Sequence, residues 1–229
     1  MRFVLPHLRP TDTVIDVGAG IGRHAVFLAQ HVAHVIAVEP SPSMRGHLEL
    51  RVAAEQADRV MVVPGRWPEA QVPPCDVAIC AHVVYSIREI GPFLMGMDSV
   101  ARRGCFVLVG FSSPSTYIAP LWERFYGEAR APLPGALECL NALYQLGIPA
   151  HLALLPASRY SFADEQEALE DMRWRLRCGG TSASDEAIRT AMRDLLERDS
   201  AGRLVPRNQP EHVAVLWWAR DSPAERGPV

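Results

Sequence analysis

The chain has 229 residues, of which 48% are hydrophobic and 21% are charged, and its formal net charge is −3. This composition excludes overall disorder, and a slightly acidic chain is not built to coat nucleic acid. No apolar run reaches the roughly 20 residues that cross a bilayer, and Pro6 interrupts the start too early for a signal peptide. We therefore expect a cytoplasmic protein without a membrane partner.

The basic residues and the cysteines exclude further classes of reaction and binding site. All 23 basic residues are arginine, so Schiff-base chemistry that depends on lysine is excluded. The five cysteines form no C-x-x-C pair, which argues against a disulfide framework and a cysteine-rich zinc site. We expect reduced thiols and no metal.

Short β-branched runs alternate with longer amphipathic stretches along the first hundred residues. The pattern predicts helices over residues 22–30 and 43–57, and strands over residues 13–17, 34–38, 60–63, 76–80 and 105–109. Near-continuous apolar strands separated by helices imply an α/β fold with a parallel sheet covered on both faces.

The rhythm changes after residue 111. Residues 112–133 are rich in serine, proline and aromatic residues, and residues 163–203 resemble two helices. A helix over 135–146, a strand over 150–155 and a last strand over 213–218 resume the alternation. We predict a single domain over residues 1–229 with two insertions, at 112–133 and 163–203.

A glycine-rich turn after the first strand carries the chemistry. Asp16 precedes Gly18, Gly20 and Gly22, and a helix follows directly. Glycines let the backbone turn tightly and approach a ligand without a Cβ in the way. A dinucleotide site would need glycine where Arg23 stands, and Asp16 would repel a pyrophosphate but suits an ammonium group.

This turn resembles the first motif of class I S-adenosylmethionine (SAM) methyltransferases, in which the acidic residue lies near the methionine part of the cofactor. The next strands support the resemblance. Glu39 ends the second strand, where the family holds the ribose hydroxyls. Pro40 and Met44 fall in the run that follows, and the segment from Ala81 and His82 is similar to one that borders the methionine end.

One position departs from the family. Gly65-Arg66-Trp67 stands where a Gly-Asp pair is common, and arginine cannot accept from the adenine amino group. We expect Arg66 or Trp67 to cover the adenine ring instead. The cofactor-binding residues expected from the resemblance are Asp16, Gly18, Ala19, Gly20, Glu39, Pro40, Met44, Arg66, Trp67, Ala81 and His82.

The resemblance implies a Rossmann-like, doubly wound, mostly parallel seven-stranded sheet with the last strand antiparallel. The two insertions are then expected to form a helical substrate lid. His82 and Tyr160 are the candidate catalytic bases, for the case in which the acceptor must lose a proton.

The resulting prediction is methyl transfer from SAM to a small molecule through oxygen, nitrogen or carbon, by a monomer or homodimer. Nucleic acid is not the expected partner, because the amide-bearing motif that marks nucleobase amino-group methylation in relatives is absent at Ala81-His82-Val83-Val84. Asp171 and Glu170 can also pair with nearby arginines of the second insertion.

The alternatives are a tRNA or protein methyltransferase, with Arg173, Arg175 and Arg177 as a docking face, or a SAM-fold protein that binds cofactor without transferring a methyl group. A nicotinamide dehydrogenase fits the glycine spacing least well.

Overall fold

The structure is a computed structural model that describes residues 1–176 and 184–220. These residues divide into two compact units. The first unit comprises Met1–Val109, Pro134–Leu154 and the described part of Ala214–Val229, and the second comprises Gly110–Leu133 and Leu155–Val213.

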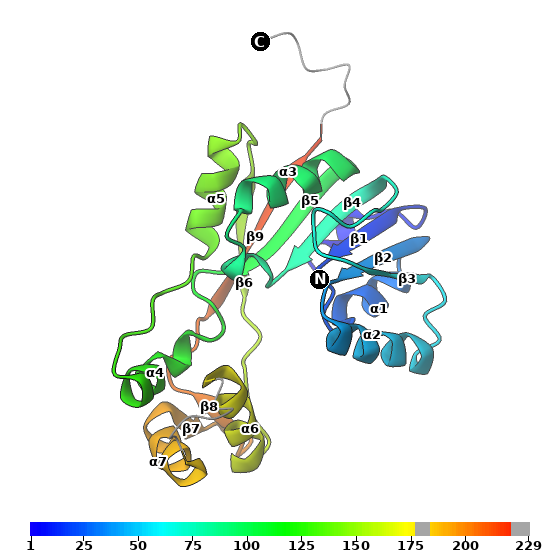
Figure 1. Cartoon of the computed structure of the whole chain (residues 1–229). Coiled ribbons are helices and arrows are strands. Elements are labelled where there is room, and N and C mark those ends of the chain that lie inside the picture. Colours follow the sequence, from blue (N-terminus) through cyan, green and yellow to red (C-terminus); the bar gives the residue numbers. More distant parts are fainter. Residues whose placement is uncertain (177–183, 221–229) are drawn as a thin grey trace. The chain divides into compact units, whose positions relative to one another are not determined.

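The first unit is built on a seven-stranded sheet with strand order β3-β2-β1-β4-β5-β9-β6 (Figure 1). Its strands are β1 (Thr13–Val17), β2 (His34–Glu39), β3 (Val60–Pro64), β4 (Cys75–Ala81), β5 (Ala101–Gly110), β6 (His151–Pro156) and β9 (His212–Ala219). β1 pairs in parallel with both β2 and β4, and β2 pairs in parallel with β3. The sheet is mostly parallel with one antiparallel strand, which confirms the predicted fold class.

Helices cover this sheet from both sides. They are α1 (Arg23–Ala29), α2 (Pro42–Ala54), α3 (Ile90–Val100) and α5 (Ala136–Gln145), with short 3-10 turns η1 (Leu5–His7) and η2 (Val84–Ser86). Ile15 and Val17 of β1 belong to the core cluster that contains Phe93 of α3 and Leu143 of α5. Because side chains alternate along a strand, Asp16 faces the opposite side, where α1 packs.

The ends of two helices follow from local sequence. Ser41 caps α2 through its side chain, which accepts from the Met44 amide at 3.4 Å, and Pro42 occupies the first turn, where its missing N–H is tolerated. Asp164 caps the first helix in the second insertion, because its Oδ1 accepts from the Glu167 amide at 2.9 Å, and the Glu167 carboxylate accepts from the Ala163 amide.

The second unit contains both predicted insertions and has its own core. Its elements are η3 (Thr116–Ile118), α4 (Ala119–Tyr126), α6 (Glu165–Leu176), α7 (Asp185–Leu195) and a hairpin of β7 (Leu196–Arg198) and β8 (Leu204–Pro206). Ile118 and Leu121 pack with Leu169 and Met172 of α6, so segments from the two insertions share one cluster.

Residues 163–203 thus hold two helices as predicted and β7 in addition, and β8 begins directly after them at Leu204. Ser184 caps α7 through its side chain, which accepts from the Ala187 amide. That the two insertions form a lid stays a prediction.

Candidate functional site: the carboxyl ends of β1, β2 and β4

The glycine turn begins where three strands end together. Asp16 of β1 lies level with Ala37 of β2 and Ile79 of β4, so the turn starts beside Glu39 and Ala81. The amides of Gly18 and Ala19 both donate to the Val38 carbonyl, at 2.9 and 3.0 Å. The chain is therefore held against the end of β2 as it leaves β1.

The glycines of the turn have different roles. Gly18 has φ of +75°, and a Cβ there would lie 2.5 Å from Cγ2 of Val83, so packing against the segment after β4 requires glycine. Gly20 has φ of +57°, but a Cβ there would meet no atom within 4 Å. The space beside Gly20 is open, as expected where a ligand approaches the backbone.

Asp16 is the most unusual group of the site. Asp16 is 1% exposed. Its Oδ2 is buried and has no hydrogen-bond partner among the described residues, and no other buried side-chain oxygen or nitrogen of those residues lacks one. The Ala25 amide of α1 stabilises its charge, but burial, and then the charge of Glu39, raise the pKa of Asp16 to about 7. A buried carboxylate with a free oxygen is a site for a cationic donor.

Glu39 is also buried, and both of its oxygens are used. Oε2 accepts from the Gly20 amide and Oε1 from the Ser41 amide, each at 2.8 Å. A carboxylate oxygen can accept two hydrogen bonds, so each oxygen keeps one acceptor position for a hydroxyl donor. Glu39 therefore fixes the glycine turn as well as offering acceptors.

His82 follows β4 in a backbone conformation rare for histidine, with φ of +60°. Its amide donates to the Leu108 carbonyl at 2.8 Å, and its Nδ1 lies 3.0 Å from the Tyr85 hydroxyl. Partial burial, and then the positive charge of Arg23, lower the pKa of His82. Its imidazole is therefore neutral at pH 7.

Two residues that were not predicted from the sequence contribute to the edge of the sheet where β1 and β4 end. Tyr85, buried beneath His82, orients its ring. His24 is half-buried in the first turn of α1, and burial with nearby positive charge lowers its pKa to about 4. The position of His24 directly after the glycine turn is the sequence feature that could have predicted its place at this site.

The remaining predicted residues separate into exposed and core positions. Pro40 and Arg66 are exposed directly after β2 and β3, and Met44 is exposed in the first turn of α2. Trp67 is 8% exposed, and its Nε1 donates to the Phe93 carbonyl at 3.0 Å, so its indole packs the core beneath α3. That Arg66 covers the adenine ring stays a prediction.

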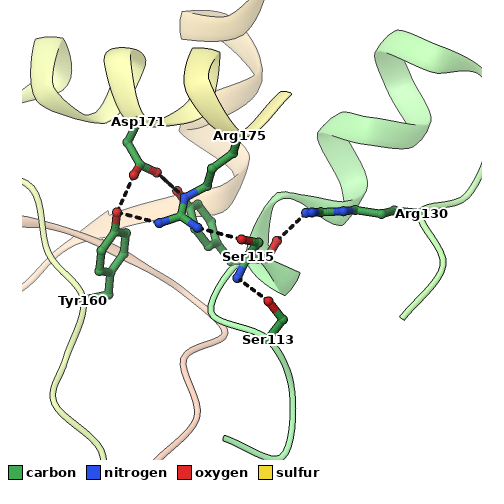
Figure 2. Close-up of polar contacts among 7 residues, drawn as sticks. Ser113, Ser115, Arg130, Tyr160, Asp171 and Arg175 are labelled. Carbon is green, nitrogen blue, oxygen red and sulfur yellow. Dashed lines mark hydrogen bonds and ion pairs between the residues drawn. The ribbon is translucent and has the colours of Figure 1, made fainter. Parts of the chain in front are cut away.

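Tyr160 lies in the second unit, in a cluster that ties segments of that unit together (Figure 2). Its hydroxyl donates to Asp171 and accepts from Arg175 at 2.9 Å. Arg175 also contacts Asp171 at 2.6 Å and Ser115 at 2.7 Å. Burial and the Asp171 carboxylate raise the pKa of Tyr160, which favours the neutral phenol over a phenolate base.

Comparison with known proteins agrees with this geometry. Residues 14–104 match the family model described as a methyltransferase domain. A probable dimethyladenosine transferase of Dictyostelium discoideum is 36% identical over 83 residues, which cover 36% of this chain and 26% of that protein. The chain thus spans about a quarter of the length of this curated relative.

Two other relatives match over most of the chain. Ribosomal RNA small subunit methyltransferase A of Thermobifida fusca is 26% identical, covering 92% of this chain and 79% of its own. Demethylmenaquinone methyltransferase of Tropheryma whipplei is 22% identical, covering 78% and 74%. Among solved structures, magnesium protoporphyrin IX methyltransferase of Synechocystis with bound SAH superimposes with a TM-score of 0.58 at 15% identity, over 96% of this chain and 78% of that one.

The fold and the turn between β1 and α1 are typical of class I SAM-dependent methyltransferases. The residues fit SAM: Asp16 offers a free buried oxygen to an ammonium group, Glu39 has acceptors left, and the space beside Gly20 is open. Residues 14–104 match a methyltransferase domain, and the geometry of the turn fits SAM as the cofactor of that domain.

The titration of Asp16 predicts how SAM affinity depends on pH. An ammonium group pairs with the charged carboxylate, and a proton competes for that carboxylate below a pKa of about 7. SAM binding is expected to be about fivefold weaker at pH 6 than at pH 7, a range over which His24, with a pKa of about 4, remains neutral. Calorimetric titration at the two pH values measures this, and an affinity that is constant or rises toward pH 6 would contradict it.

Proposed function

We propose that this chain transfers the methyl group of SAM to a small organic acceptor. The observation that carries the proposal is the free, fully buried oxygen of Asp16 beside the open space at Gly20. When bound, SAM supplies an electrophilic methyl group on a sulfonium. The chain's own residues bind the cofactor: Asp16 takes the ammonium group, and Glu39 fixes the turn and accepts from the ribose.

The arginines of the second unit support a small acceptor over RNA. Arg175 is 11% exposed and paired with Asp171, as predicted, and Arg173 pairs with Asp185 at 3.4 Å in place of the predicted Glu170. Arg177 lies outside the described residues. Binding to RNA needs cationic side chains that neutralise phosphates and so release the counterions held by the RNA. Arg173 and Arg175 are instead paired with aspartates of the protein.

The end of β4 supports the same conclusion. Ala81, His82, Val83 and Val84 carry no side-chain amide or carboxylate that could hold an exocyclic amino group of a nucleobase. The relative that acts on demethylmenaquinone, by its name, has a small-molecule acceptor.

Methylation of ribosomal RNA is the second candidate, because a ribosomal RNA methyltransferase matches 92% of the chain. An assay with methyl-labelled SAM separates the two. Label is followed into a small-molecule extract and into RNA, the two separated by size. Transfer to the small-molecule fraction supports the proposal, whereas transfer only to RNA would overturn it in favour of the second candidate.

The neutral imidazole of His82 makes it a candidate to accept a proton from an acceptor hydroxyl. If it does, His82→Ala is expected to lower turnover about 100-fold while changing the Kd of SAM less than threefold. Single-turnover rates and calorimetric titration measure the two effects. Equal losses of turnover and affinity would contradict the base role and leave only a cofactor contact.

A further inference from the structure

The outer side of α5 carries two large apolar side chains that nothing in the first unit covers. The inner side of α5 packs into the core cluster through Ala136, Cys139 and Leu143. A helix that covers a sheet in this way normally has polar residues on its outer side. Leu137 is instead 59% exposed and Tyr144 is 80% exposed. Glu138 is the only charged residue of α5, and its Oε2 accepts from the Gly135 amide at 2.8 Å.

α3 extends this surface. It packs beside α5 (Figure 1), and a Cβ at Gly91 would lie 3.8 Å from Cδ2 of Leu146, directly after α5. Met95, one turn further along α3, is 49% exposed. Asp98 is the only charged residue of α3, and it accepts from the Trp218 indole at 2.9 Å. The charged side chains of both helices are thus bound to groups of the protein itself, and protein interfaces are depleted in charge and enriched in tyrosine and methionine at their centres.

The apolar residues of α5 are placed symmetrically about the centre of the helix. α5 runs from Ala136 to Gln145, so Leu137 and Tyr144 lie at equal distances from its centre. They are seven residues apart, which places them on one side of the helix and about 10.5 Å apart along its axis. A two-fold axis through the centre would therefore place Leu137 of one copy against Tyr144 of the other, and the reverse. Asn141 is exposed near that centre, and its amide has the donors and the acceptor that pairing with its own copy needs.

We propose that the outer side of α5 binds a second copy of this chain, with the two α5 helices antiparallel across a two-fold axis and Met95 at the rim. A copy of the same surface brings no charge that the apolar side chains would have to desolvate, and its residues match those of α5 in position. α5 is about 15 Å long, so the interface is small and the dimer is weak and reversible. The proposal is independent of methyl transfer and of the cofactor site.

Sedimentation equilibrium of the full chain at about 1–300 µM tests the proposal, with an expected dimer Kd of about 10–100 µM. Leu137→Glu and Tyr144→Arg are each expected to raise this Kd at least tenfold (about), because each places a charge against an apolar side chain of the other copy. Leu50→Glu is the matched control, because Leu50 is 69% exposed on α2, and it should leave the Kd unchanged. Thermal unfolding shows that each variant is folded.

The double variant tests the two-fold arrangement itself. The introduced glutamate of one copy then faces the introduced arginine of the other, so the combined loss of affinity should be smaller than the product of the two single losses. A combined loss equal to that product or larger would overturn the pairing. A wild type that stays monomeric, a dimer that both single variants leave unchanged, or assemblies that grow beyond the dimer would also overturn the proposal, whether or not the chain binds SAM.

Discussion

Asp16→Asn is expected to weaken SAM binding about 10- to 100-fold and, at pH 8, to stabilise the ligand-free protein. The loss of affinity follows because an amide cannot replace the charge-assisted hydrogen bond to an ammonium group, which is worth about 1.5–3 kcal/mol. Calorimetric titration with SAM measures the first effect and thermal unfolding without ligand measures the second.

The gain in stability follows from the raised pKa of Asp16. A carboxyl group whose pKa is about 7 in the folded protein and 3.8 in the unfolded chain favours folding in its protonated form. That contribution is fully present below about pH 4 and is lost as the pH rises through 7. Asp16→Asn removes the buried charge, but the new amide finds only part of its hydrogen-bond partners. We therefore expect the free energy of unfolding to rise by about 2 kcal/mol, which corresponds to about 4–8 °C in Tm.

Glu49→Gln is the control for this experiment, because Glu49 is exposed on α2 and its loss removes the same charge from the surface. It should change neither SAM affinity nor Tm measurably. SAM should raise the Tm of wild type and of Glu49→Gln far more than that of Asp16→Asn. An Asp16→Asn protein that binds SAM within threefold of wild type would remove Asp16 from the site.

The second large effect is expected at Arg103, which neutralises a buried acid. Asp12 is 3% exposed, and the Arg103 guanidinium contacts both of its oxygens, at 2.7 and 2.5 Å. Arg103→Ala leaves this carboxylate buried without its cation, and we expect a loss of about 3 kcal/mol, or about 6–12 °C in Tm. Thermal and urea unfolding measure it.

The neighbouring residue provides the matched control. Arg102 also pairs with an aspartate, Asp76 at 3.6 Å, but its side chain is 61% exposed. Arg102→Ala should cost less than about 1 kcal/mol, because solvent screens an exposed pair. The double variant Asp12→Asn with Arg103→Met should recover part of the loss. Equal effects of the two single arginine variants would contradict the burial argument.

The sequence by itself determined the fold class and the location of the cofactor site. An acidic residue, a glycine turn and a helix after a buried strand are adjacent in the chain, and local propensity and hydrophobic period are read directly from neighbours. Because parallel strands end at one edge, the sequence also predicts that Asp16, Glu39, Arg66 and His82 lie at the same edge of the sheet.

The tertiary structure alone decided how these residues are used. The free oxygen of Asp16 depends on what surrounds it in space, and the use of both Glu39 oxygens depends on how the glycine turn folds back over β2. Trp67 occupies the core beneath α3, where the residue's neighbours come from a segment 26 residues away.

Contacts between residues far apart in the sequence also decide how the second unit and Asp12 are arranged. Tyr160 and Ser115 meet through Arg175, and Asp12 meets Arg103 from 91 residues away. Such contacts are set by chain packing between distant segments, which no local pattern encodes. The sequence thus determined which chemical groups line the edge of the sheet, and the packing decided which of them are buried, partnered or free to bind a ligand.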